Sequence, residues 1–161
     1  MRSTSNISSG SDRDLVTTNI IVYTDFKKMD LIKLHQIKMF ALEQMEKWGV
    51  SDWDFVWDNK AVRRYGQCRY GSKQIGISKK LASINSLEET KDTVLHEIAH
   101  ALTGPGHGHD AVWKRMCVKV GARLERCYTS EDNGGTVKTI EGKWKLINKE
   151  TGQVYRHYHR R

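Results

Sequence analysis

The spacing of apolar residues along the first half of the chain predicts one long helix followed by three short strands. Apolar positions between residues 29 and 48 recur every three or four residues, as they do on one face of a helix, and Gly49 ends that run. Trp53, Phe55 and Trp57 occupy alternate positions, which is the period of a half-buried strand. Two more strands are expected, at residues 63–70 and 74–78.

The second half of the chain predicts two helices and a hairpin. Ser86 followed by Glu89 is a capping-box pattern that begins a helix, and the run at residues 104–106, Gly-Pro-Gly, ends it. A second helix is expected from about Asp110, as its N-cap, to Val120. Two short segments that flank a turn predict the terminal hairpin, at residues 144–147 and 154–158.

Together these elements predict an α+β fold. It has a long N-terminal helix, a small mostly antiparallel sheet, two later helices and a C-terminal β-hairpin. A length of 161 residues suits one domain with a small appendage. Residues 1–14 are serine-rich and are expected to form a disordered leader. The domain is expected to cover residues 15–128, and a basic β appendage residues 129–161.

The most specific chemical signal is the run His96-Glu97-Ile98-Ala99-His100 on a predicted helix. Histidines at positions i and i+4 lie on one helix face and can bind the same ion. Glu97 can act as a general base toward a water that the metal activates. His109, beyond the Gly-Pro-Gly run, can supply a third ligand and leave a fourth position open, as in catalytic zinc sites. We therefore expect one Zn²⁺ held by His96, His100 and His109.

Other residues compete for the role of third ligand. His107 lies between two glycines in the turn, whereas His109 lies where entry into the next helix can fix its direction, so His109 is preferred. A downstream carboxylate is another alternative, and Glu125 is the nearest candidate. His107 and Tyr128 are retained as residues that could contact the substrate, support the site or stabilise the oxyanion.

Three segments besides the metal helix resemble those of a known family. They are the stretch from His109 to Trp113, the basic-aromatic-Gly-x-Cys segment at residues 64–69 and the strand at residues 75–78. Together with the metal helix they resemble the SprT-like metalloprotease domain, the zincin family that includes Spartan, a protease for DNA–protein crosslinks. The similarity covers about residues 29–126. It implies a zincin-like fold, one catalytic zinc with His109 as third ligand, and endopeptidase activity.

The chain departs from that family at two points. Asp110 stands where the family has a glycine, which is a small change at a helix-capping position. Many members carry a C-terminal zinc ribbon with paired Cys-x-x-Cys motifs, but the cysteines here, Cys68, Cys117 and Cys127, form no such pair. The terminal hairpin is therefore expected to keep the shape of the ribbon without a metal.

The charge of the chain indicates a nucleic-acid partner. The formal net charge is +8, and residues 142–161 carry six Lys and Arg against one Glu, with aromatic residues interleaved. Basic clusters bind phosphate backbones and aromatic side chains stack on exposed bases, although both also occur on ordinary surfaces. The residues expected to bind DNA are Lys143, Lys145, Arg156, Arg160 and Arg161.

The expected location is the cytoplasm. No apolar run approaches the length needed to cross a membrane, and the N-terminal residues lack the features of a secretion signal. An odd number of cysteines without an evident pairing suits a reducing compartment. A nucleoid-associated or a virus-encoded protein would both fit this location.

The preferred function is cleavage of proteins bound to or near DNA, with Glu97 as the catalytic base. The substrate is expected to lie extended along the sheet edge near residues 74–78. The alternative is a nucleic-acid-binding adaptor whose zinc is purely structural. That alternative requires a fourth protein ligand, such as His107 or Glu125, and no proteolysis. Glu97 favours the enzyme, because a structural site has no need of it.

Overall fold

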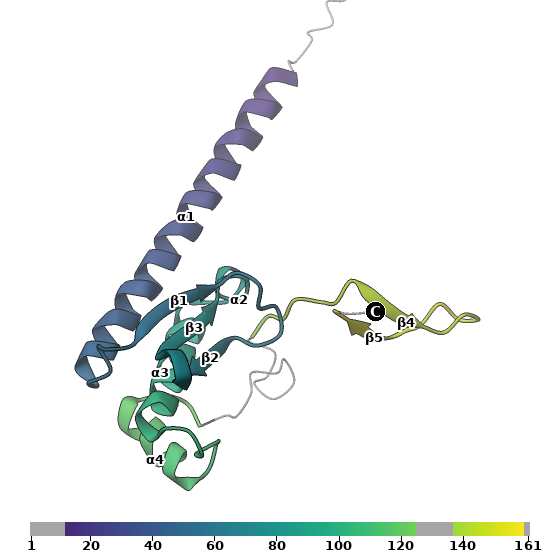
Figure 1. Ribbon diagram of the computed structural model, residues 1–161. Coiled ribbons are helices and arrows are strands. Elements are labelled where there is room, and N and C mark those ends of the chain that lie inside the picture. The colour runs from purple at the N-terminus through teal and green to yellow at the C-terminus, as the bar shows by residue number, and fades with distance from the viewer. Residues whose placement is uncertain (1–11, 125–136, 160–161) are drawn as a thin grey trace, which may run out of the picture.

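The computed structural model describes residues 12–124 and 137–159, which form an α+β fold, as predicted (Figure 1). It opens with α1 (Asp12–Lys47), which begins well before the predicted start at Met29. Neither glycine nor proline interrupts the sequence of α1, and its first half extends away from the other elements (Figure 1). Of the expected leader, residues 12–14 belong to α1 and the others lie outside the described residues.

Three strands form a mixed sheet in which β3 is central. The strands are β1 (Asp54–Asp58), β2 (Gly66–Arg69) and β3 (Gln74–Ser78), in the spatial order β1-β3-β2. β3 runs parallel to β1 and antiparallel to β2, where a mostly antiparallel sheet is predicted. The difference arises because the short turn η1 (Tyr70–Ser72) pairs β2 with β3. The segment between β1 and β2 therefore has to carry the chain past β3 to its other side.

The central position of β3 corrects the predicted substrate edge. Residues 74–78 have a hydrogen-bonded strand on each side, so they offer no free edge to an extended peptide. The edge strands are β1 and β2, and of these β2 packs beside the metal helix. An added strand near the predicted metal site would have to pair with β2.

Three helices follow the sheet: α2 (Lys79–Ile84), α3 (Leu87–Thr103) and α4 (Ala111–Val120). α3 and α4 are the two predicted helices, whereas the short α2 was not anticipated from the apolar pattern. The Ser86 hydroxyl accepts the backbone N–H of Glu89, and the Asp110 carboxylate accepts those of Val112 and Trp113. Both predicted N-caps are confirmed, because each satisfies donors that the first helical turn leaves unpaired.

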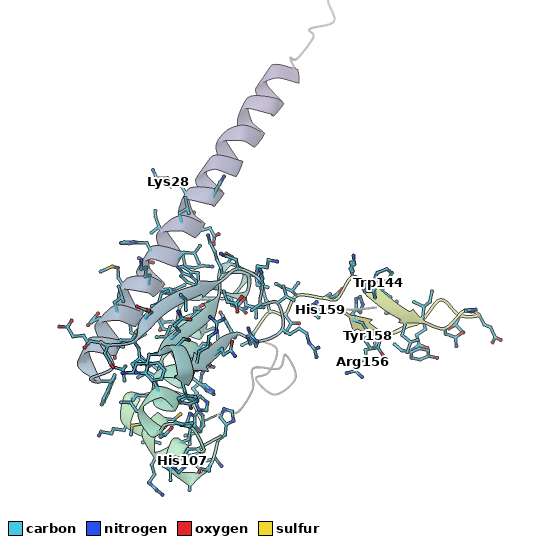
Figure 2. All side chains as sticks on the ribbon, viewed as in Figure 1. Lys28, His107, Trp144, Arg156, Tyr158 and His159 are labelled. Carbon is cyan, nitrogen blue, oxygen red and sulfur yellow. The ribbon has the colours of Figure 1, made fainter. Side chains whose placement is uncertain are left out.

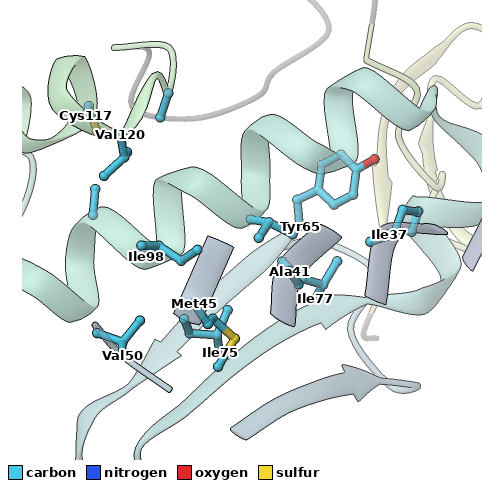
Figure 3. Close-up of a cluster of buried hydrophobic side chains, with 14 of the residues drawn as sticks. Ile37, Ala41, Met45, Val50, Tyr65, Ile75, Ile77, Ile98, Cys117 and Val120 are labelled. Atoms are coloured by element: carbon cyan, nitrogen blue, oxygen red, sulfur yellow. The ribbon is translucent and has the colours of Figure 1, made fainter. Parts of the chain in front are cut away.

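The hydrophobic core lies where α3 packs against α1, α4 and the sheet (Figure 3). Ile37 of α1, Ile75 and Ile77 of β3, and Ile98 of α3 are fully buried there. Trp113 of α4 is also fully buried. α3 is therefore enclosed on several sides, and its polar residues are buried together with its apolar ones.

The chain returns to the domain at Val137, which is 3% exposed, before it forms a separate hairpin. The Asn85 side chain donates to the Lys138 carbonyl at 2.8 Å and accepts the Lys138 N–H, which holds this segment beside α2 and α3. β4 (Trp144–Ile147) and β5 (Val154–Tyr158) then pair antiparallel, with the bounds predicted from the sequence. The hairpin extends away from the domain (Figure 1).

The described ranges contain neither a candidate membrane span nor a disulfide. None of their helices combines the length and the apolar character that crossing a bilayer requires. Cys68 and Cys117 are free thiols, and Cys127 lies outside the described residues. The cytoplasmic location stays a prediction.

Candidate metal centre

Three histidines from two parts of the chain converge on one point. His96 and His100 lie one turn apart on α3, and His109 lies in the turn that leads into α4. The Nε2 atom of His109 is 3.1 Å from that of His96 and 3.2 Å from that of His100. Two nitrogen ligands of a tetrahedral zinc, with bonds of about 2.0–2.1 Å, lie about 3.3 Å apart. The three side chains therefore fit such an ion.

The turn between α3 and α4 brings His109 back over α3. Gly104 and Gly106 adopt φ angles of 80° and 103°, which other residues reach only with strain, so the chain can reverse direction directly after α3. Asp110 then begins α4, and its carboxylate accepts two backbone N–H groups at 2.9 Å. The glycines and the cap together fix where His109 lies.

Trp113 closes the inner side of the histidine cluster. Its ring centroid lies 4.7 Å from that of His96, 5.1 Å from that of His100 and 4.4 Å from that of His109. Because the three imidazoles pack on one buried aromatic surface, their orientations are restricted. The sequence shows Trp113 only as an apolar position of α4, so its contact with all three histidines is visible only in the structure.

Burial keeps the histidines of α3 neutral, which is the state that binds a metal. It lowers the pKa of His96 to about 3, with further lowering from the neighbouring His100 and His109. Burial also lowers the pKa of His100 to about 4, again with a contribution from His109. At neutral pH these rings therefore offer lone pairs to a cation.

The carboxyl group of Glu97 is held against β2, beside the histidines. Glu97 is 7% exposed, and the backbone N–H of Cys68 donates a hydrogen bond to its carboxyl group. Burial raises the pKa of Glu97 to about 8, against the lowering effects of that hydrogen bond and of the Arg64 charge. A carboxyl group whose pKa is moved toward neutrality in a cleft is typical of a general base.

Gly66 makes room for the carboxyl group of Glu97. A Cβ atom at position 66 would lie 2.7 Å from Cγ and 2.8 Å from Cδ of Glu97, and closer still to Oε1. Any side chain at this position would therefore displace the carboxyl group. A glycine inside a strand is a sequence signal of such a close approach. In the sequence, Gly66 stands out only as part of the basic-aromatic-Gly-x-Cys segment, and nothing in that segment reveals its contact with Glu97.

The histidines and Glu97 open into a cleft of about 1100 Å³. Gly66, Cys68 and Tyr70 of β2 and η1 line it, as do the segment 137–142 and residues of β5. The Tyr70 hydroxyl donates to the His100 carbonyl at 3.2 Å and so ties this lining to α3. The edge strand β2 thus borders the cleft that contains the metal ligands.

His107 lies beside the site but outside the group of three. Its Nδ1 atom is 2.8 Å from Oδ2 of Asp110, and the residue lines the cleft near α4 (Figure 2). Within residues 12–124 and 137–159, the group whose ligand atoms lie close enough to share an ion is His96, His100 and His109. Tyr128 and the alternative ligand Glu125 lie outside the described residues.

The predicted DNA-binding residues divide between the hairpin and the chain terminus. Lys143, Lys145 and Arg156 are exposed on or next to β4 and β5. Arg160 and Arg161 lie outside the described residues. Of these residues, Arg156 also lines the cleft that contains the three histidines.

A comparison with protein families identifies the kind of protein. The family model described as the SprT-like family matches residues 34–133. This chain belongs to the SprT-like family. The resemblance drawn from four sequence segments is thereby confirmed. No curated protein and no solved structure matches the chain. SprT-like membership indicates a zincin-like metalloprotease, and the three histidines fit the metal ion that this kind of protein holds.

The choice of His109 over His107 as third ligand can be tested by metal binding. We expect the wild-type chain to bind one Zn²⁺. His109→Ala should lower the affinity for Zn²⁺ by about a hundredfold or more, because one of the three protein ligands is lost. His107→Ala, a matched change two residues away, should leave the affinity nearly unchanged. Competition titration with a chromophoric chelator measures both. Loss of zinc in His107→Ala with retention in His109→Ala would reverse the assignment.

Proposed function

We propose that this SprT-like protein is a zinc-dependent endopeptidase that cleaves proteins bound to or near DNA. The observation that carries the proposal is the placement of Glu97. Its carboxyl group lies beside the three convergent histidines and faces a cleft large enough for a peptide segment. A general base next to a metal site with an open position is the arrangement that metal-assisted peptide hydrolysis uses.

The chain's own residues have defined tasks in this mechanism. His96, His100 and His109 would hold the zinc ion, which when bound supplies Lewis acidity toward a water and the substrate carbonyl. Glu97 accepts a proton from the attacking water and then donates it to the leaving amine. The Cys68 N–H donates a hydrogen bond that orients the Glu97 carboxyl group for both proton transfers, and Gly66, which has no side chain, leaves room for that group.

The substrate is proposed to bind as an added strand along β2. β3 has a neighbour on each side, whereas β2 ends the sheet and lines the cleft. Pairing along a strand edge uses backbone hydrogen bonds and reads few side chains. Such a protease would accept many sequences, so its selectivity would have to come from a second binding surface.

The hairpin supports DNA as the source of that selectivity. Trp144 and Tyr158 lie opposite each other across β4 and β5 and are 39% and 41% exposed (Figure 2). The Lys143 ammonium lies 5.1 Å from the Trp144 ring centroid, and the Arg156 guanidinium 5.5 Å from that of Tyr158. Exposed rings flanked by cations suit the stacked bases and phosphates of a nucleic-acid strand. We name Lys143, Trp144, Arg156 and Tyr158 the aromatic–cation face.

The alternative function, an adaptor with a structural zinc, is less well supported. A structural site has four protein ligands, and the group in the described residues offers three. The adaptor also gives no reason for the close packing of Glu97 against Gly66. Zinc-loaded wild-type protein that cleaves no protein, with or without DNA, would favour the adaptor.

Replacement of the general base provides the first test. We expect Glu97→Gln to retain zinc, because the histidines are unchanged, and to lose cleavage by about a hundredfold or more, because an amide cannot accept the proton. The assay follows digestion of a basic DNA-binding protein by gel electrophoresis, with and without single-stranded DNA. Cleavage at the wild-type rate in a zinc-loaded Glu97→Gln sample would refute the mechanism.

Gly66→Ala tests whether the position of the Glu97 carboxyl matters. The added methyl group should displace that carboxyl and reduce cleavage by about a hundredfold, while zinc affinity stays unchanged. Gly71→Ala is the matched control, because a Cβ atom there meets nothing within 4 Å. Equal activity of the two variants would show that the contact with Gly66 has no catalytic role.

The aromatic–cation face can be tested by binding to labelled oligonucleotides. Trp144→Ala should weaken binding of single-stranded DNA by about tenfold, because one stacked base loses its platform. Tyr155→Ala is the control, since side chains alternate along β5 and Tyr155 lies on the opposite face from Tyr158. Fluorescence anisotropy on single- and double-stranded DNA gives both affinities. Equal losses in the two variants would contradict the assignment of this face.

A further inference from the structure

α1 carries a second line of residues, apolar in its middle and charged at its ends, about 120° around the helix from the face that packs into the core. Its members recur at alternating intervals of four and three residues, which keeps them on one side of a helix. We name this set the outer stripe: Lys28, Ile32, His35, Met39, Leu42 and Glu46. Ile32 and Met39 are each 51% exposed, and Leu42 is 41% exposed. Large apolar side chains gathered on one exposed face commonly mark a contact surface.

The outer stripe is distinct from the core face of the same helix. The core face comprises Leu34, Ile37, Ala41 and Met45, each no more than 6% exposed. A helix that covers a domain needs one apolar face, whereas a second group of exposed apolar residues on another face is typical of a helix that is covered there too. The core contacts of α1 therefore do not account for the outer stripe. Figure 2 shows Lys28, its first member, where α1 leaves the rest of the domain.

We propose that the outer stripe pairs with the outer stripe of a second copy of this chain, with the two α1 helices antiparallel. In that arrangement position 32 meets position 42 of the other copy, and position 35 meets position 39. Ile32 thus contacts Leu42 twice, once on each side of a two-fold axis, and His35 lies against Met39. Such a contact is isologous, because both copies use the same surface.

The charged ends of the outer stripe determine the direction of the pairing. Antiparallel packing places Lys28 of each copy opposite Glu46 of the other, which gives two pairs of opposite charge. Parallel packing would place Lys28 against Lys28 and Glu46 against Glu46, which is unfavourable. Among the side chains of residues 27–124 and 137–159, neither Lys28 nor Glu46 has an ion-pair partner. Both side chains are exposed and so remain accessible to a second copy.

The size of the outer stripe sets the expected strength of the dimer. From position 28 to position 46 a helix is about 27 Å long, and a single helix pair of that length buries less than the roughly 1,200–2,000 Å² of a stable interface. We therefore expect a dimer that dissociates on dilution. Among the described residues that line the cleft, none belongs to α1, so dimerisation would leave the cleft of each copy open.

Sedimentation equilibrium of the full chain tests the proposal, with Glu97→Gln as the parent so that self-cleavage does not interfere. The parent should change from monomer to dimer over about a hundredfold range of concentration. Leu42→Glu should be monomeric throughout, because it buries a charge against Ile32. Val118→Glu on α4, at a residue that is 68% exposed, should dimerise like the parent. Circular dichroism checks that each variant is folded.

A charge exchange tests the antiparallel register. Lys28→Glu and Glu46→Lys should each weaken the dimer by about tenfold, because each creates two contacts between like charges, one on each side of the two-fold axis. The double variant restores opposite charges and should recover the parent affinity. Lys27→Glu, a change of equal charge 100° away around the helix, should have little effect. A parent that is monomeric at every concentration would overturn the proposal. A dimer that survives Leu42→Glu, or a double variant that fails to recover, would overturn it equally.

Discussion

The polar side chains buried along α3 impose the constraint on which the rest of the structure depends. Thr90, Thr93, His96 and Glu97 are between 0% and 7% exposed on a helix whose other buried residues are apolar. A buried polar group without a partner is costly, so the surrounding elements have to supply partners. Thr90 contacts the Tyr65 hydroxyl at 2.7 Å, Glu97 receives the Cys68 N–H, and the imidazoles converge on a site that fits a cation.

The segment from Tyr65 to Cys68 meets most of that demand. One edge of this segment pairs with β3 in the sheet. Toward α3 it offers the Tyr65 hydroxyl to Thr90, space at Gly66 for the Glu97 carboxyl group, and a backbone N–H to that carboxyl group. The same residues end the sheet and line the cleft. The strand that positions the general base is therefore also the strand that the proposed substrate would pair with, so chemistry and substrate share one rigid support.

The domain keeps its chemistry in the core and presents its contact surfaces on the elements that extend away from it. α1 leaves the domain at one side and the β4–β5 hairpin at another (Figure 1). α1 carries exposed aliphatic residues, which suit a second protein surface, whereas the hairpin carries exposed rings with cations over them, which suit a nucleic acid. Neither surface includes a metal ligand, but Arg156 and Tyr158 of the hairpin also line the cleft that contains the three histidines.

Local signals in the sequence determined the helices of the metal centre, the hairpin and the candidate ligands. Ser86 and Asp110 cap their helices by accepting hydrogen bonds from backbone N–H groups two or three residues further along the chain. The spacing of His96 and His100 places both on one helix face, whatever the rest of the fold. The predicted start of α1 is too late, because the apolar pattern marks only the part of the helix that packs against the domain, whereas the helix begins before that part. Only the tertiary structure decided that β3 is central, that Gly66 faces Glu97 and that Trp113 lies under the histidines. Those contacts join residues far apart in the chain, and their partners are chosen by the packing of the whole domain rather than by any one segment.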